Sequence, residues 1–149
     1  MQSKIKSYIE LARLDKPIGI YLLLWPSLLG LILGFIQSAQ ISLKNILIVI
    51  IGSVLVRSCG CVINDISDYK LDKLVKRTAN RPIPSGAISL EEAWLFFIFL
   101  SLCSLCLLTF TPYVTMKIAF VFAAMIMIYP LTKRFFMAPQ FILGITFGS

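Results

Sequence analysis

Long apolar segments alternate with short polar segments along this 149-residue chain. Apolar runs cover residues 17–36, 45–63, 93–110 and 114–131, and a fifth begins at 138 and continues to 149. A helix needs roughly 20 apolar residues to cross a hydrocarbon layer about 30 Å thick. The pattern therefore predicts an all-α, multi-span transmembrane helical bundle. We expect four complete spans and the start of a fifth, in a single membrane-embedded partial domain.

The composition agrees with a membrane protein. Hydrophobic residues make up 58% of the chain and charged residues only 14%, whereas soluble domains average about 25% charged residues. The sequence contains no histidine, which excludes acid–base catalysis or metal binding by imidazole. All four cysteines fall inside apolar runs, where a thiol usually acts as a small hydrophobic side chain. Any chemistry must therefore depend on carboxylates, amides, Lys, Arg or Tyr.

Charged residues are unevenly divided between the two ends of the expected spans. One side carries all the acidic residues and most of the cations, namely Lys4, Lys6, Arg13, Lys16, Lys70, Lys73, Lys76, Arg77, Arg81, Lys133 and Arg134. The other side carries only Lys44 and Lys117. Because short cytoplasmic loops are enriched in Lys and Arg, we expect the N-terminus and the 64–89 loop to face the cytoplasm.

Arg57 lies inside the second apolar run, about two helical turns before Asn64. A charged residue within a membrane span usually has a partner or a function, which makes Arg57 a candidate substrate contact. A side chain that reaches the membrane surface explains its presence equally well.

Three oxygen-bearing side chains follow the second apolar run at intervals of four residues: Asn64, Asp68 and Asp72. On a helix of about 3.6 residues per turn they stack on one face. Neighbouring carboxylates repel each other unless a cation neutralises them, and oxygen ligands suit Mg²⁺ better than zinc or copper. The spacing therefore predicts a Mg²⁺ site at the end of this helix.

A basic stretch from Lys73 to Arg81 comes directly after the acidic residues. By itself such a stretch is typical of a cytoplasmic loop or of a patch that attracts anionic lipid. Beside a Mg²⁺ site, Arg77 and Arg81 become candidate ligands of a diphosphate. A guanidinium offers paired donors to phosphate oxygens while Mg²⁺ takes the remaining ones.

Several separate motifs resemble the UbiA-type intramembrane prenyltransferases. The segment 60–86, which contains Asn64-Asp65, Asp68, Asp72, Lys76-Arg77-Thr78 and Asn80-Arg81-Pro82, resembles the first aspartate-rich motif of that family. Segments 14–19 and 22–26, and Tyr129-Pro130 with Lys133-Arg134, resemble the 4-hydroxybenzoate polyprenyltransferase branch. The similarity extends over essentially the whole chain.

The resemblance implies an all-helical fold of about nine spans, of which this chain would be the N-terminal part. It also implies Mg²⁺-dependent transfer of a polyprenyl chain from polyprenyl diphosphate to 4-hydroxybenzoate, in the ubiquinone pathway and in a bacterial inner membrane. The expected partners are these two substrates and the lipid bilayer, with no nucleic acid and no protein partner.

The resemblance also assigns roles to particular residues. The implied metal set is Asn64, Asp65, Asp68 and Asp72, in which Asp65 lies off the shared face and either ligates a second ion or caps the helix. The implied catalytic set is Asp68, Asp72 and Arg134. The implied substrate-binding set is Arg13, Lys16, Arg57, Lys76, Arg77, Arg81, Tyr129 and Lys133. Lys76, Arg77 and Arg81 would lie along the phosphate side, while Arg13, Lys16 and Arg134 are candidates for the acceptor carboxylate. The presence of Arg13, Lys16 and Arg134 is explained almost as well by side chains that anchor helix ends at the membrane surface.

The second aspartate-rich motif of the family has no counterpart in this sequence, whose last acidic residues are Glu91 and Glu92. The last apolar run also stops before it could cross a bilayer. We therefore expect an incomplete protein, from a truncated reading frame, a gene fragment or a partial sequence, which is inactive alone.

Two other classes of membrane protein share some of these features. A CDP-alcohol phosphatidyltransferase also places aspartates at the end of a membrane helix, but no Asp-Gly-x-x-Ala-Arg stretch precedes these aspartates. A transporter or channel fragment would carry charges near mid-membrane, whereas these acidic residues cluster at one end of the spans. A UbiA-type enzyme with another acceptor remains a further alternative.

Overall fold

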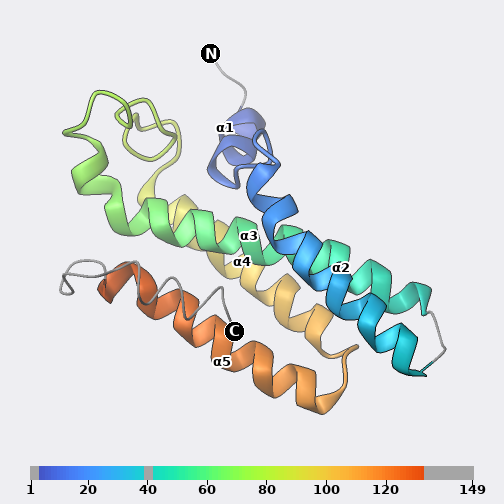
Figure 1. The fold of residues 1–149 in the computed structure, drawn as a ribbon. Coiled ribbons are helices and arrows are strands. Elements are labelled where there is room, and N and C mark those ends of the chain that lie inside the picture. Colours follow the sequence, from blue (N-terminus) through green and yellow to red (C-terminus); the bar gives the residue numbers. More distant parts are fainter. Residues whose placement is uncertain (1–3, 39–41, 133–149) are drawn as a thin grey trace.

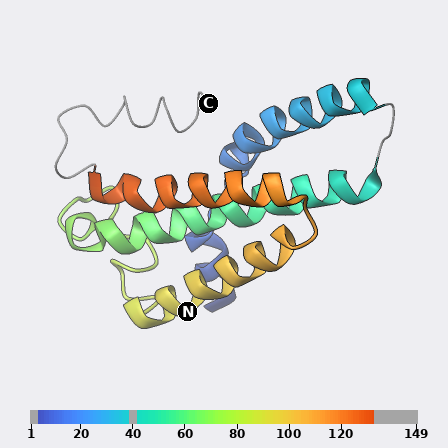
Figure 2. The same cartoon turned by 90° about the horizontal axis from the view of Figure 1, so that it is seen from below.

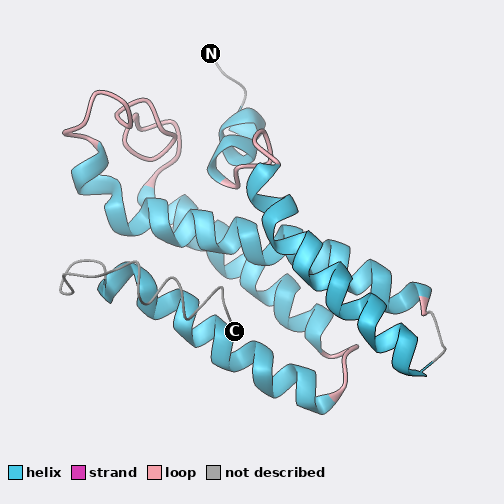
Figure 3. Cartoon of the chain, in the orientation of Figure 1, coloured by secondary structure: helices cyan, strands magenta, loops and turns pink. Residues whose placement is uncertain are grey.

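The computed structural model describes the backbone of residues 4–38 and 42–132, and the side chains of residues 4–37 and 42–124. Five helices form this part of the chain: α1 (Lys4–Leu11), α2 (Ile18–Ser38), α3 (Leu43–Asp72), α4 (Leu90–Leu108) and α5 (Tyr113–Thr132). Figure 3 shows helices joined by loops, with no strand in the described ranges. The prediction of an all-helical bundle is confirmed. The fifth apolar run expected from residue 138 lies outside the described residues.

Three helical segments among the described residues are long and apolar enough to cross a membrane: Ile18–Gln37, Leu43–Asp72 and Leu90–Leu108. The searched part of α5, Tyr113–Ala124, is also apolar but shorter. No residue in the most apolar stretch of α2 is buried inside the protein. In a bilayer these side chains contact lipid, which makes their exposure favourable there.

The long helix α3 is the centre of the bundle. It packs most extensively against α4, then against α2, and less extensively against α5 and α1. Figures 1 and 2 show α2, α4 and α5 arranged around α3, with α1 and the 73–89 loop near one end of the bundle. That end therefore brings together segments that are distant in the sequence.

The buried core lies at the same end of the bundle. Its members come from α1, from the second half of α3, from the 73–89 loop and from α4: Leu11, Val62, Ile63, Ile66, Ile83, Ile88, Ala93, Phe97 and Leu100. The largest side chains that are fully buried are Leu11, Ile88 and Val62. Burying such a side chain stabilises the fold by about 1.5–3 kcal/mol. The loop is thus held by its own apolar residues.

Helix α4 starts with a capping box. The Ser89 hydroxyl accepts a hydrogen bond from the Glu92 backbone N–H at 3.1 Å, and the Glu92 carboxylate accepts one from the Ser89 N–H at 3.0 Å. The same carboxylate also forms an ion pair with Lys4. The hydrogen bond to Glu92 raises the pKa of the Lys4 amine. These contacts link the start of α1 to the start of α4.

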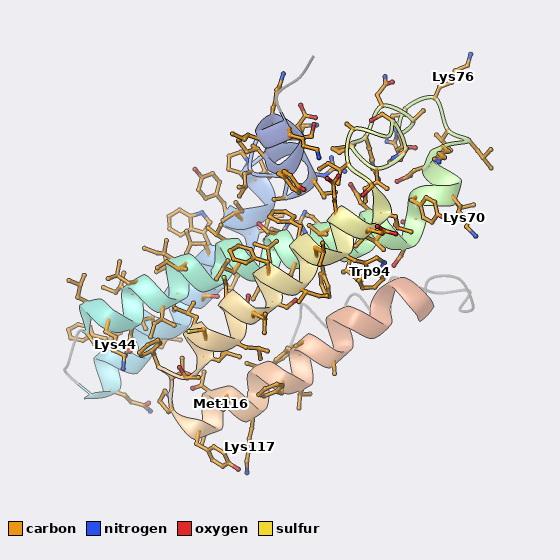
Figure 4. All side chains as sticks on the ribbon, turned by 180° about the vertical axis from the view of Figure 1, so that it is seen from behind. Lys44, Lys70, Lys76, Trp94, Met116 and Lys117 are labelled. Atoms are coloured by element: carbon orange, nitrogen blue, oxygen red, sulfur yellow. The ribbon has the colours of Figure 1, made fainter. Side chains whose placement is uncertain are left out.

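The two ends of the bundle differ in charge. Figure 4 shows Lys70 and Lys76 at one end, and Lys44, Met116 and Lys117 at the other. This placement agrees with the division of cations expected from the sequence. The side of the membrane that each end faces stays a prediction.

Candidate functional site

The column of Asn64, Asp68 and Asp72 lies on the last turns of α3, which remains helical through Asp72. Residues at i, i+4 and i+8 of a continuous helix share one face. Asn64 and Asp68 are half-buried and Asp72 is buried. The helix therefore presents two carboxylates and an amide in one row at its C-terminal end.

A hydrogen bond from the following loop fixes the end of this row. The buried Thr78 hydroxyl donates to the backbone carbonyl of Asp72 at 3.0 Å, or to that of Val75 at 3.3 Å. Carbonyls in the last turn of a helix have no partner within the helix, so a side-chain donor stabilises this terminus. Thr78 thereby holds the loop against the helix end.

Asp65 lies beside the column but points into the protein, with only 2% of its surface exposed. Both of its carboxylate oxygens lie 3.5 Å from Nη2 of Arg13, and Oδ1 lies 3.2 Å from Nη1 of Arg81. A buried carboxylate is costly unless cations and hydrogen bonds compensate it. The two guanidinium groups offset part of that cost.

Arg81 connects Asp65 to the column. Its Nη1 atom donates to Oδ2 of Asp72 at 2.7 Å and also lies against Asp65. The loop around Arg81 is itself folded, since Ser85 N–H donates to the Arg81 carbonyl at 3.0 Å and Ile88 N–H donates to the Pro82 carbonyl at 3.0 Å. The loop thus holds a cation against both acidic residues.

Arg13 sits in an unusual backbone conformation. Its φ is +58°, in the left-handed region that favours glycine. Helix α1 ends here in a Schellman motif, in which the Arg13 N–H donates to Glu10 at 3.1 Å and the Leu14 N–H donates to Ile9 at 3.0 Å. Glycine usually fills this position. The side chain of Arg13, which reaches Asp65, is therefore placed by a backbone turn that costs energy for arginine.

Arg57 lies on α3 against Gly19 of α2. A Cβ atom at Gly19 would come within 2.7 Å of Arg57 Cζ and 2.6 Å of Nη2. Such distances are far shorter than an ordinary van der Waals contact. The Arg57 Nε atom is buried and makes no hydrogen bond within the described residues. Gly19 thus leaves room for a guanidinium between two membrane helices.

The remaining predicted site residues are either exposed or have side chains outside the described part of the chain. Lys76 and Arg77 are exposed on the loop, and Lys16 is exposed in the turn between α1 and α2. Tyr129 belongs to α5, but its side chain lies outside the described residues, as do Lys133 and Arg134 altogether. The structure therefore brings together Arg13, Arg81, Asp65 and Asp72, but does not place the predicted residues near the C-terminus.

The donor set is compatible with part of a Mg²⁺ site. Among the described residues, no three His, Cys, Asp or Glu side chains are grouped closely enough to hold a metal ion. However, Mg²⁺ commonly takes only one or two carboxylates from a protein and its remaining oxygens from substrate phosphates and water. Asp68, Asp72 and the amide of Asn64 fit that smaller contribution.

Sequence reasoning did not find the pairing of Asp65 with Arg13 and Arg81. One signal was present, because Asp65 lies three residues after Val62 and one before Ile66, on the apolar face of the helix. A carboxylate on that face needs a cation. Its partners are 52 and 16 residues away in the sequence, so spacing alone does not identify them.

Comparison with known proteins identifies the family. The model of the UbiA prenyltransferase family matches residues 23–149. The chain belongs to the UbiA prenyltransferase family. This membership and the apolar helices together make it an integral membrane protein, and prenyltransferases of this family are generally metal-dependent.

Two similar UbiA-family relatives carry the name 4-hydroxybenzoate octaprenyltransferase. The protein from Vesicomyosocius okutanii subsp. Calyptogena okutanii is 47% identical over 136 residues, which cover 91% of this chain and 49% of that protein. The protein from Shewanella loihica is 40% identical over 148 residues, which cover 99% of this chain and 51% of that protein. The chain thus spans about half the length of these relatives.

A solved structure shows the same arrangement of helices. It is described as "Structural and mechanistic insights into the biosynthesis of Digeranylgeranylglyceryl phosphate synthase in membranes". The two chains are 30% identical with a TM-score of 0.77, and the match covers 99% of this chain and 50% of that one.

Proposed function

We propose that this chain forms the first diphosphate-binding side of a Mg²⁺-dependent aromatic prenyltransferase. The enzyme would transfer a polyprenyl chain from polyprenyl diphosphate to 4-hydroxybenzoate in ubiquinone biosynthesis. One observation carries the proposal: Asn64, Asp68 and Asp72 share a face at the end of an apolar helix, and Arg81 is bound to Asp72 at 2.7 Å. This combination offers metal ligands and a phosphate donor at one place.

The diphosphate side of the site consists of the column and the loop. Asn64, Asp68 and Asp72 would hold Mg²⁺, which when bound supplies positive charge to the departing diphosphate. Arg81 would donate to phosphate oxygens, and the exposed Lys76 and Arg77 would add donors from the same loop. Donors that are already in position stabilise the developing negative charge without reorganisation.

The proposed binding site for the acceptor consists of cations that lie nearer the membrane. Arg57 has a buried Nε atom without a hydrogen bond in the described residues, which supports a role for Arg57 in binding the carboxylate of 4-hydroxybenzoate. Arg13 and Lys16 lie in the turn between α1 and α2 and would also contribute to acceptor binding. We include Tyr129, Lys133 and Arg134 in this site because of the motifs in which they occur. Apolar helices around the reacting carbon would exclude water, which would otherwise capture it.

We further propose that the cationic end of the bundle faces the cytoplasm of a bacterium, across the inner membrane. The excess of Lys and Arg at this end supports that orientation. Because this chain matches about half of each relative, the second diphosphate-binding side would come from sequence corresponding to the other half.

The similar proteins favour 4-hydroxybenzoate over another acceptor. Relatives named for that acceptor are 40–47% identical to this chain, whereas the solved structure, described in terms of a glyceryl phosphate synthase, is 30% identical. An aromatic carboxylate acceptor also agrees with the buried Nε atom of Arg57, which has no hydrogen bond within the described residues.

A transfer assay tests the proposal. The chain is produced in bacterial membranes together with the unmatched half of the Shewanella loihica relative, and supplied with Mg²⁺, farnesyl diphosphate and radiolabelled 4-hydroxybenzoate. We expect Mg²⁺-dependent appearance of label in a lipid-soluble product, and none when either half is absent. Transfer to a glyceryl phosphate acceptor but not to 4-hydroxybenzoate would refute the acceptor assignment.

A further inference from the structure

We infer that Asp65 is a positioning residue that holds Arg13 and Arg81 beside the diphosphate-binding column, rather than a metal ligand. The inference deepens the proposed function and rests on it for the nature of the ligand. The ion pairs themselves are features of the chain without any ligand.

The surroundings of Asp65 argue against metal binding. Its carboxylate is 2% exposed and already faces two guanidinium groups, at 3.5 Å and 3.2 Å. A Mg²⁺ ion on this carboxylate would face both cations, and like charges repel in a buried site. Asp72 pairs with Arg81 alone among the described residues and is therefore the better placed of the two carboxylates to accept a metal ion. Asp65 lies about 100° from Asn64 around the helix and two turns before Asp72, and Nη1 of Arg81 fills the space between the carboxylates of Asp65 and Asp72.

Asp65 is the point at which two distant segments meet. Arg13 comes from the turn after α1, and Arg81 comes from the loop after α3. The left-handed backbone at Arg13, with φ +58°, costs roughly 1 kcal/mol or more for a residue other than glycine. Within the described residues its ion pair with Asp65 offers a reason for arginine at this position.

Asp65 contributes to diphosphate binding because it shares Arg81 with Asp72. A single nitrogen, Nη1, contacts both Asp65 and Asp72. If the carboxylate of Asp72 turns to a ligand, Asp65 still holds the guanidinium next to the column. Without Asp65, Arg81 would keep only the contact with Asp72, and the loop that carries it would lose one of its attachments to α3.

The test compares Asp65→Asn with Glu92→Gln, in the full chain reconstituted in lipid nanodiscs. Both changes replace a carboxylate by its amide and remove an ion pair, but Glu92 pairs with the distant Lys4, and glutamine can still complete the capping box. The first readout, without metal or phosphate, is trypsin cleavage after the exposed Lys76 and Arg77. The second is binding of inorganic diphosphate in the presence of Mg²⁺.

We expect Asp65→Asn to accelerate cleavage of the loop several-fold and to weaken diphosphate binding about tenfold, the effect of losing one charged hydrogen bond. Glu92→Gln should change neither. Unchanged cleavage in Asp65→Asn would overturn the anchoring of the loop. Faster cleavage with unchanged diphosphate binding would overturn the positioning role.

Two further variants keep the result interpretable if Asp65→Asn does not fold. Arg81→Gln removes the cation of the loop and leaves Asp65 paired with Arg13, so it should accelerate cleavage of the loop and weaken diphosphate binding. Asp65→Glu retains the charge and should restore most of the binding. Failure of the unaltered chain to bind diphosphate would reject the proposed function and, with it, the positioning role. The cleavage rates would still show whether Asp65 attaches the loop to α3.

Discussion

Nη1 of Arg81 lies 2.7 Å from Oδ2 of Asp72 and 3.2 Å from Oδ1 of Asp65. One guanidinium thus joins the carboxylate expected to bind a metal to a carboxylate that is buried. Because Arg81 also belongs to the loop that covers the end of α3, its position depends on both the loop and the helix.

Replacement of Arg81 by lysine should weaken diphosphate binding by roughly tenfold to a hundredfold, because lysine keeps the charge but cannot offer a planar pair of donors to two acceptors. Calorimetric titration of the reconstituted chain with inorganic diphosphate and Mg²⁺ measures the effect. Arg77→Lys is the matched control, since Arg77 is exposed on the same loop. Equal losses in the two variants would show that the contacts of Arg81 have no special importance.

The turn at Arg13 yields a second prediction, based on a pair of variants. Arg13→Gly and Arg13→Ala both remove the ion pair with Asp65, but only glycine tolerates φ +58° without strain. We expect the alanine variant to be less stable than the glycine variant by about 1 kcal/mol. Unfolding in a denaturing detergent, followed by tryptophan fluorescence, measures this difference. Equal stability would mean that the left-handed turn is not retained.

Much of the architecture could be predicted from the pattern of apolar residues. The runs at 17–36 and 93–110 correspond closely to α2 and α4, because lipid-facing and buried positions are both apolar in a membrane helix. The short helix α1 was not predicted, since its eight residues are amphipathic but too few to form a long apolar run. The row of Asn64, Asp68 and Asp72 followed from spacing because all three lie on one helix.

The contacts between segments could not be predicted in the same way. The pairs of Asp65 with Arg13 and Arg81 depend on how the α1–α2 turn and the 73–89 loop fold against α3. The sequence shows a carboxylate on an apolar face but gives many cations as possible partners. The contact of Arg57 with Gly19 likewise depends on the packing of two helices.

The Gly19 contact leads to a third prediction. Gly19→Ala should destabilise the packing of α2 on α3 by about 1 kcal/mol, the low end of the overpacking range, because the added methyl group must displace the Arg57 guanidinium at the end of a flexible side chain. Gly30→Ala is the matched control on the same helix, since nothing lies within 4 Å of its added Cβ. That change should be neutral or slightly stabilising. The free energies of unfolding in detergent provide the comparison.

A double variant distinguishes the cause. In Gly19→Ala combined with Arg57→Ala the steric conflict is absent, so the effects of the two changes should not add. Strict additivity would contradict the contact between these residues.

The most direct test of the central claim is binding of farnesyl diphosphate to the reconstituted chain, with and without Mg²⁺. We predict Mg²⁺-dependent binding that is lost in Asp68→Asn and in Asp72→Asn, because each removes an anionic ligand from the column. Glu91→Gln, at an exposed carboxylate on α4, should bind like the unaltered chain. Binding that is independent of Mg²⁺, or that is unchanged in both aspartate variants, would contradict the claim that this helix end is a metal–diphosphate site.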